Sequence, residues 1–173
     1  MMAPVTAELP PRRTDGPYRI ALVCLGNICR SSVADVVLTT RLADAGLADL
    51  VSVDSAGTAD WHRGKSMDPR AAESLRSAGL DPSAHRARHF DRTWAGRHDL
   101  VLAMDASNLA DLRPLVDEHH RLRLFRDFDP LDPGSDVPDP YYGGEDGFAA
   151  VLAMVERTSA ALVAALQQEL VDA

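Results

Sequence analysis

The chain has 173 residues, a formal net charge of −8 and an isoelectric point near 5.1. This length suffices for one domain with its own hydrophobic core, and the acidic balance argues against nucleic acid as the main partner. We find no apolar run as long as a membrane span and no secretory signal. The sequence therefore predicts a cytoplasmic protein with no membrane partner, and export without a signal is the alternative.

The first 17 residues differ in composition from the rest of the chain. They include four prolines and show no apolar periodicity, which is typical of segments that cannot bury enough apolar surface to fold. We therefore expect a disordered, proline-rich N-terminal extension over residues 1–17 and a single domain over residues 18–173.

Strand and helix patterns alternate along that domain. In chain order we expect a strand at 19–24, a helix from about 32 to 46, a strand at 51–54, a helix at 69–78, a strand at 99–104, a helix from about 105 to 116, a strand at 121–125 and a helix from about 148 to 170. Ser32 and Asp35 fit a capping box for the first helix, and Asp105 is placed to cap the third. The alternation predicts a three-layer α/β domain with a mainly parallel sheet, whose ligand site lies at the carboxyl ends of the strands.

The segment between the first strand and the first helix carries the strongest chemical signal. It reads CLGNICRS over residues 24–31, so that five residues separate Cys24 from Arg30. A loop at this place can direct successive N–H groups at a phosphate dianion, and the helix dipole adds partial positive charge. Arg30 can hold two phosphate oxygens through its forked guanidinium, which leaves Cys24 facing phosphorus. The segment therefore predicts a phosphate-binding loop that contains its own nucleophile.

The neighbouring residue types agree with this hypothesis. A thiol near a helix N-terminus and cationic groups has a lowered pKa, and the hydroxyl of Ser31 can hydrogen-bond the thiolate. Gly26 and Asn27 both tolerate the left-handed backbone angles that such a loop requires. The alternative is that Cys24 is an inert cysteine at a strand end and that Arg30 is a surface charge. The combination of strand, Gly-Asn, serine and helix favours the functional interpretation.

Attack of a thiolate on a phosphate ester also needs an acid that protonates the departing oxygen. Asp139 is a candidate because prolines flank it in a loop that also contains Tyr141 and Tyr142. Spacing alone is weak support, since the chain has 26 acidic residues and an aspartate between prolines is usually a turn former. At this level both interpretations of Asp139 stay open.

Several segments together resemble the low-molecular-weight protein tyrosine phosphatases, in particular those of actinobacteria. The resemblance rests on residues 24–31 and on Asp-Pro-Tyr-Tyr-Gly at 139–143, and it extends through 54–58, 84–88, 104–105 and 128–130 in the same order. It implies a four-stranded parallel sheet with helices on both faces and the phosphate-binding loop after the first strand.

The resemblance also implies roles for individual residues. It makes Cys24 the nucleophile, Arg30 the phosphate clamp, and Asp139 the general acid that later acts as base. The rest of the phosphate-binding loop would be Leu25, Gly26, Asn27, Ile28, Cys29 and Ser31. Ser55 and His85 would belong to the hydrogen-bond network that supports the loop, although His85 is otherwise read as a solvated loop histidine. Trp61, Tyr141 and Tyr142 would form the wall of the cleft.

Three rival functions compete with this one. Arsenate reductases with a thiol relay need cysteines beyond the loop, whereas this chain has only Cys24 and Cys29. Related phosphoarginine phosphatases carry threonine at the position of Ile28, and the bulkier isoleucine favours an aryl phosphate. A non-enzymatic anion-binding or redox-sensing module is the third. Cys29 is close enough in sequence to trap an oxidised Cys24 as a disulfide, which we interpret as redox regulation of an enzyme.

The sequence thus predicts a protein-tyrosine-phosphatase, a phosphoric monoester hydrolase that works through a phosphocysteine intermediate. Its expected partners are phosphotyrosine proteins and the phosphate or other oxyanions that bind in the loop. We expect no cofactor and no metal.

Overall fold

The computed structural model describes residues 7–141, 143 and 145–172, and its centre is a four-stranded parallel sheet. The strands are β1 (Tyr18–Cys24), β2 (Val51–Gly57), β3 (Leu100–Ala103) and β4 (Leu122–Leu124). Their order across the sheet is β2-β1-β3-β4, and each neighbouring pair is parallel. Since all strands run the same way, their carboxyl ends meet at one edge.

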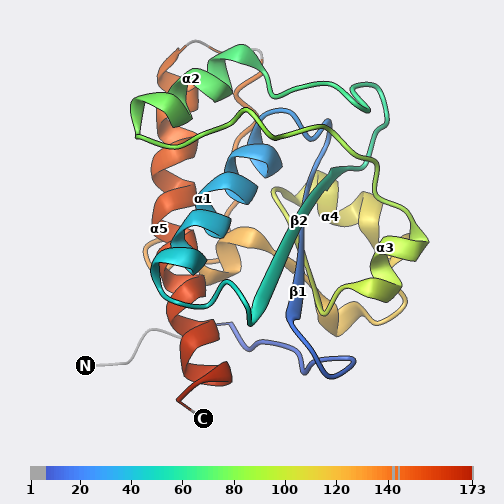
Figure 1. Ribbon diagram of the computed structural model, residues 1–173. Coiled ribbons are helices and arrows are strands. Elements are labelled where there is room, and N and C mark those ends of the chain that lie inside the picture. Colours follow the sequence, from blue (N-terminus) through green and yellow to red (C-terminus); the bar gives the residue numbers. More distant parts are fainter. Residues whose placement is uncertain (1–6, 142, 144, 173) are drawn as a thin grey trace.

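Helices cover both faces of this sheet, as the sequence predicts (Figure 1). They are α1 (Arg30–Asp44), α2 (Pro69–Ser77), α3 (Arg92–Arg97), α4 (Ala106–Leu112) and α5 (Glu145–Leu170). In Figure 1, α1, α2 and α5 lie on one side of the sheet, and α3 and α4 lie on the other. The fold is therefore the expected three-layer α/β/α arrangement.

Two apolar cores result from the alternation of side chains along the central strand. Ile20 and Leu22 of β1 face the core beneath α1, α2 and α5, whereas Ala21 and Val23 face the core beneath α3 and α4. All four side chains are fully buried, which is why β1 reads as a continuous apolar run. The sheet is thereby fixed from both sides, and the edge where the strands end is held rigidly.

Two local predictions differ from the structure. The first helix begins at Arg30, with Cys29 as its N-cap and no side-chain cap, so the capping box at Ser32 and Asp35 is wrong. The carboxylate of Asp35 instead accepts hydrogen bonds from side chains farther along the chain. The sequence also missed α3, a six-residue helix whose N-cap, Asp91, accepts a hydrogen bond from the N–H of Trp94.

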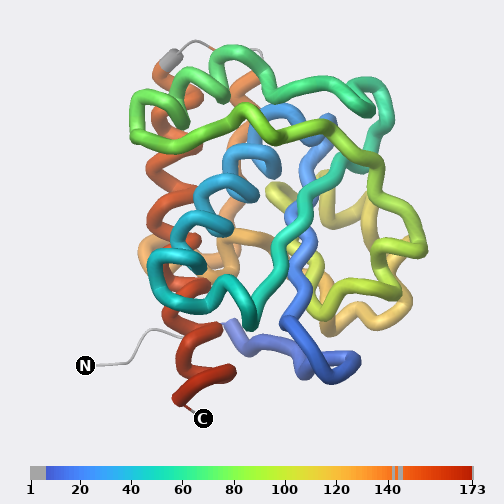
Figure 2. The backbone as a smooth tube through the Cα atoms, viewed as in Figure 1, coloured from blue at the N-terminus to red at the C-terminus, as the bar shows by residue number. Residues whose placement is uncertain are grey.

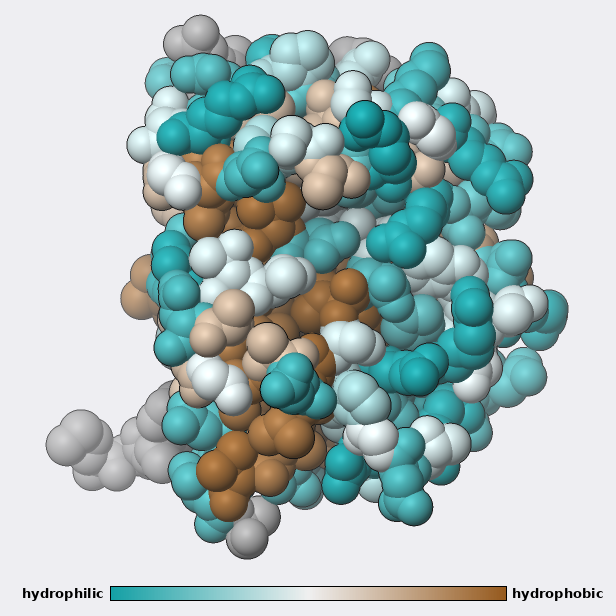
Figure 3. Space-filling model, in the orientation of Figure 1, coloured by the Kyte–Doolittle hydropathy of each residue, from teal (hydrophilic) through white to brown (hydrophobic). Residues whose placement is uncertain are grey.

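The closing helix corrects a further expectation. Over Asp146–Leu170, α5 is long and apolar enough to cross a membrane by length and composition, whereas no run of this kind was expected from the sequence. In the structure, however, Phe148, Val155, Leu162 and Leu166 of this helix are buried in the core, and α5 packs on α1. On the face of the molecule drawn in Figure 3, hydrophobic residues form a band that runs from top to bottom on the left, and hydrophilic residues interrupt it. Over the apolar window of membrane-spanning length, 39% of the helix is buried in the domain.

Residues 7–17 contain no helix or strand, but they lie against the domain at the end where β1 starts (Figure 2). The N–H of Arg13 donates to Asp99 Oδ1 at 2.7 Å, and its guanidinium donates to the carbonyls of His98 at 2.9 Å and Ala95 at 3.3 Å. The same side chain forms an ion pair with Glu118 at 3.0 Å. These contacts tie the described part of the extension to the sheet edge opposite the carboxyl ends of the strands.

We expect Arg13→Ala to lower the free energy of unfolding by about 1–2 kcal/mol, because partly buried carbonyls lose a charged donor. Urea unfolding measures this change. Arg12→Ala is the matched control, because Arg12 is exposed and donates only to Gly16 O, within the extension; it should change stability by less than about 0.5 kcal/mol. Equal midpoints for the two variants would show that the Arg13 side chain does not stabilise the domain.

Candidate active site

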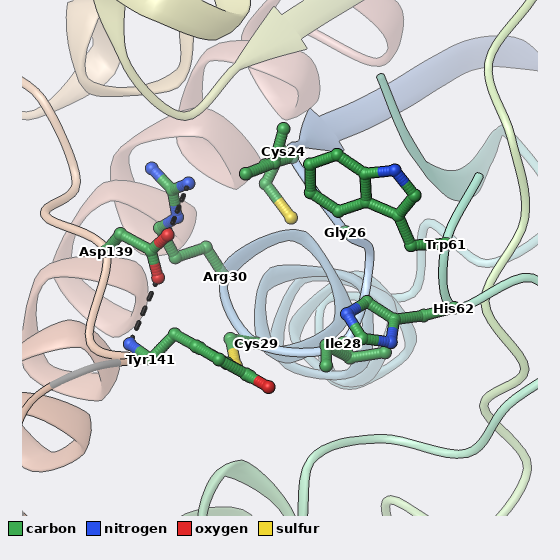
Figure 4. Close-up of a pocket in the computed structure, with 10 residues that line it drawn as sticks. Cys24, Gly26, Ile28, Cys29, Arg30, Trp61, His62, Asp139 and Tyr141 are labelled. Carbon is green, nitrogen blue, oxygen red and sulfur yellow. Dashed lines mark hydrogen bonds and ion pairs between the residues drawn. The ribbon is translucent and has the colours of Figure 1, made fainter. Parts of the chain in front are cut away.

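The loop for which the sequence predicts phosphate binding, residues 24–31, lies where β1 ends and α1 begins, at the carboxyl edge of the sheet (Figure 4). Asn27 has φ of 58°, the left-handed conformation that the sequence allowed for it. Gly26 is not among the glycines that have positive φ, so its backbone conformation does not call for glycine. What distinguishes this position is the space that a side chain would occupy. A Cβ there would lie 2.9 Å from His62 Cδ2. The turn of the loop therefore depends on Asn27, whereas a side chain at position 26 would have to displace the imidazole of His62.

The sulfur of Cys24 is at the centre of this loop. Its Sγ accepts the N–H of Asn27 at 3.3 Å and is 3.0 Å from Ser31 Oγ. Cys24 is only 2% exposed, and its Sγ points into the cavity in Figure 4. The N-terminus of α1 has no side-chain cap, so first-turn N–H groups and the helix dipole are directed at the same point. Hydrogen-bond donors and partial positive charge are therefore gathered around the sulfur.

The side chain of Asn27 joins the loop to the segment that precedes α3. Its Nδ2 donates to Ser31 Oγ at 2.8 Å, and its Oδ1 accepts the N–H of Arg88 at 2.9 Å. His85 Nε2 lies 2.6 Å from the carbonyl oxygen of Asn27. Burial lowers the pKa of His85, so a neutral imidazole with its proton on Nε2 donates this bond. His85 thus contacts the loop backbone directly and is not a solvated loop histidine.

Ser55, in contrast, lies one step behind the loop. Its hydroxyl donates to Asp35 Oδ2 at 2.8 Å, and Thr39 Oγ1 donates to the other carboxylate oxygen at 3.2 Å. Burial raises the pKa of the Asp35 carboxyl. The contact between β2 and the loop comes from Ala56, whose carbonyl accepts from Ser31 Oγ at 3.4 Å. Ser55 therefore fixes β2 to α1 and does not touch the loop sulfur.

Arg30 is held beside the loop by three groups. Its Nη1 donates to Asp105 Oδ2 and, at 3.1 Å, to the carbonyl of Val137. Its Nη2 lies 3.5 Å from Asp139 Oδ2. The side chain is 3% exposed, and a buried guanidinium fixed in this way is oriented before any ligand arrives. The loop arginine is thus preorganised.

Asp139 is brought to this arginine from the far end of the sequence. Its Oδ1 accepts the N–H of Tyr141 at 3.1 Å, and its side chain is 35% exposed at the rim of the cavity. The loop that carries it is pinned to the sheet edge, because the N–H of Val137 donates to Met104 O at 2.7 Å. The carboxyl group therefore faces the loop cysteine across the cavity in Figure 4.

Together these groups surround a cavity of about 260 Å³. Its lining residues are Cys24, Leu25, Gly26, Ile28, Cys29, Arg30, Trp61, His62, Asp139 and Tyr141. Trp61 is 68% exposed at one wall, and Tyr141 forms another (Figure 4). Tyr142, the other predicted wall residue, lies outside the described residues. Among the residues that the structure does describe, no group of three histidine, cysteine or acidic side chains is arranged to hold a metal ion.

The two cysteines of the loop differ in their surroundings. Both are free thiols in the structure. Burial raises the pKa of the Cys29 thiol to about 12, and the nearby Asp68 carboxylate adds to this effect. Cys29 is therefore protonated at neutral pH, whereas Cys24 lies among the hydrogen-bond donors. This contrast favours Cys24 as the nucleophile.

Two residues that bear on the site were not recognised as such from the sequence. Asp105 was assigned as a helix cap, and its Oδ1 does accept the N–H of Asn108 at 2.7 Å, but its Oδ2 holds Arg30. Gly57 lies so close to the loop that an added Cβ would be 2.6 Å from Leu25 O. Gly57 is the last residue of β2, and a glycine at the end of a strand was the available sequence signal for this close approach.

A cysteine-arginine loop at the carboxyl end of the first strand of a parallel sheet is the site of a phosphate-ester enzyme. The sequence model for "Low molecular weight phosphotyrosine protein phosphatase" matches residues 19–172. A low molecular weight protein-tyrosine-phosphatase of Streptomyces coelicolor is 48% identical, over 88% of this chain and 95% of the relative. The low molecular weight protein-tyrosine phosphatase A of Mycobacterium tuberculosis is 42% identical, over 81% and 86%.

Solved structures agree with these relatives. The crystal structure of a protein tyrosine phosphatase from Entamoeba histolytica, with Hepes in its active site, superposes with a TM-score of 0.83 at 31% identity, covering 88% of this chain and 98% of that one. The chain belongs to the low molecular weight protein-tyrosine-phosphatase family, and its similarity to the Streptomyces and Mycobacterium proteins fits the actinobacterial type. Its enzyme class is that of a protein-tyrosine-phosphatase.

Proposed function

We propose that the protein hydrolyses phosphotyrosine in proteins through a phosphocysteine intermediate formed on Cys24. One observation carries the proposal. The sulfur of Cys24, the guanidinium of Arg30 and the carboxyl of Asp139 line the same cavity at the N-terminus of α1. A nucleophile, an oxyanion clamp and an acid are the three groups that transfer of a phosphoryl group to a thiol requires.

In the first step, the thiolate of Cys24 attacks phosphorus in line with the phenolic oxygen. The P–S bond forms as the P–O bond to the tyrosine ring breaks, and Asp139 gives its proton to the departing oxygen. Arg30 and the N–H groups of the loop hold the equatorial oxygens, where negative charge is concentrated. Preorganisation of Arg30 by Asp105 means that little reorganisation is required during the step.

In the second step, a water molecule attacks phosphorus from the side that the phenol has left. The carboxylate of Asp139 takes a proton from this water, the P–S bond breaks, and the electron pair returns to the sulfur of Cys24. Inorganic phosphate leaves and Asp139 is protonated again. The same group thus serves as acid and then as base, and the cycle needs neither an oxidant nor a cofactor.

The shape of the cavity supports an aryl substrate. Cys24 is 2% exposed at the floor, while Trp61 and Tyr141 stand at the rim. A phosphate on a tyrosine ring can reach such a floor while its ring contacts the aromatic walls, whereas the shorter side chain of phosphoserine cannot. Ile28 adds an apolar surface to the same cavity.

The substrate prediction is tested with matched phosphotyrosine, phosphoserine and phosphoarginine peptides, with EDTA present. We expect release of phosphate from the phosphotyrosine peptide alone, because of the depth of the cavity and its aromatic walls. Faster release from phosphoarginine would retain the mechanism but overturn the substrate. A folded, reduced protein that acts on none of the three would overturn the proposed function.

We further propose a cytoplasmic location and redox regulation at the loop. A reducing compartment keeps thiols free, as Cys24 needs for catalysis. A peroxide would oxidise the Cys24 thiolate to a sulfenic acid and would itself be reduced by two electrons. Cys29 would then attack this sulfur, and its thiol proton would leave with the displaced hydroxide as water. The product is a disulfide that a thiol can reduce again.

A further inference from the structure

Arg70 connects two loops that the sequence does not join. It is the second residue of α2, which lies beside the start of α5 in Figure 1. Its Nε and Nη2 donate to the two carboxylate oxygens of Asp68, at 3.2 Å and 3.1 Å. Asp68 is the N-cap of α2 and also accepts the N–H of Arg70 at 2.8 Å. The guanidinium is thus oriented by a fork of hydrogen bonds.

On its other side, Arg70 holds the loop that carries Asp139. Its Nη2 donates to the carbonyl of Tyr141 at 2.8 Å, and its Nη1 donates to the carbonyl of Gly143 at 3.3 Å. Its Cζ lies 5.6 Å from the centre of the Tyr141 ring and 4.8 Å from that of Phe148. One side chain therefore contacts the backbone and a ring of the segment immediately after Asp139.

The pair formed by Asp68 and Arg70 is also attached to the phosphate-binding loop. The N–H of Asp68 donates to the carbonyl of Ile28 at 3.0 Å. At the other end, the N–H of Tyr141 donates to Asp139 Oδ1. A continuous set of hydrogen bonds thus runs from Ile28 through Asp68, Arg70 and Tyr141 to the carboxyl of Asp139.

We propose that Arg70 is a positioning residue, which fixes the carboxyl of Asp139 relative to the phosphate-binding loop. The inference rests on the proposed function, because it gives Arg70 a task only if Asp139 acts as the acid. Arginine suits this task because its planar fork binds a carboxylate on one edge and carbonyl oxygens on the other, whereas a lysine offers a single ammonium. A displacement of about 1 Å of a catalytic group can cost roughly 10²-fold in rate.

The test compares two aryl phosphates through kcat/KM, which reports the steps up to phenol release. Phenyl phosphate has a poor leaving group and needs the acid, whereas p-nitrophenyl phosphate has a good one. We expect Arg70→Gln to lower kcat/KM about tenfold or more for phenyl phosphate and far less for p-nitrophenyl phosphate. Arg70→Lys, which keeps the charge without the fork, should show the same selective loss. Wild-type rates in this variant would overturn the role of the fork.

A double-mutant cycle separates positioning from general destabilisation. In an Asp139→Asn background, Arg70→Gln should have almost no further effect on phenyl phosphate, because the group that it positions is already inactive. Losses that multiply would overturn the inference. Arg76→Gln is the matched control on the same helix, since Arg76 is exposed and its ion pair, at 4.0 Å, is with Glu73 of that helix; it should leave both rates unchanged.

Failure of this inference is distinguishable from failure of the proposed function. If the wild-type protein does not hydrolyse either aryl phosphate, the proposed function fails. If the wild-type protein is active and Arg70→Gln retains both rates, or loses both equally, only the positioning role of Arg70 is overturned. Affinity for inorganic phosphate should be unchanged in Arg70→Gln, which verifies that the loop itself is intact.

Discussion

Replacement of Cys24 by serine is expected to abolish turnover of phosphotyrosine, with a loss of at least about 10⁴-fold in kcat. Serine keeps the size of the side chain, but its hydroxyl is not ionised at neutral pH and has no adjacent base. The substitution replaces the sulfur atom at the centre of the loop, which is contacted by the N–H of Asn27 and by Ser31 Oγ. Phosphate release from a phosphotyrosine peptide measures the effect.

The same variant should still bind oxyanions, because Arg30 and the N-terminus of α1 are unchanged. Inorganic phosphate is expected to raise its thermal unfolding midpoint, as a ligand that binds only the native state must do. Turnover that survives in Cys24→Ser would overturn the assignment of the nucleophile. A variant that neither turns over substrate nor responds to phosphate would show that the substitution damages the loop, and Cys24→Ala would then repeat the comparison.

Replacement of Asp139 by asparagine is expected to lower kcat/KM about 10²-fold or more for phenyl phosphate. The amide cannot donate a proton to the leaving phenolate. The loss should be much smaller for p-nitrophenyl phosphate, whose leaving group departs without help. The difference between the two substrates, measured under the same conditions, reports the acid role.

Asp132→Asn is the control for this prediction. Asp132 belongs to the same proline-rich loop, but it is exposed and its ion pair, at 3.4 Å, is with Arg126 and not with Arg30. It should leave both rates close to those of the wild-type protein. Equal losses on the two substrates in Asp139→Asn would contradict the acid role. The aspartate would then have only a structural role, as the ion-pair partner of Arg30.

The parts of the site that are contiguous in the chain were predictable from the sequence. Cys24, Arg30 and Ser31 lie on one strand-loop-helix unit, and local geometry alone brings them together. The left-handed conformation of Asn27 was also predictable, because asparagine tolerates it. The capping box at Ser32 failed because the buried loop, and not a side-chain cap, occupies the start of α1.

The position of Asp139 in the site could not be predicted from its neighbours in the sequence. Between its prolines it reads as a turn residue, and only the resemblance to a family suggested an acid. The structure brings it to Arg30 because Val137 is hydrogen-bonded to the end of β3 through Met104. Asp105 reaches the same arginine for a similar reason, since it lies two residues after the end of β3.

By itself, then, the sequence determined the alternating strands and helices, the parallel sheet and the position of the cysteine-arginine loop. Those features depend on periodicity and on residues close together in the chain. The tertiary structure decided which distant side chains complete the site. Asp105 and Asp139 contact Arg30, His85 contacts Asn27, and Arg70 contacts the backbone of Tyr141, two residues after Asp139. The physical reason is that parallel strands gather their carboxyl ends at one edge, and packing of the helices then fixes which loops meet there.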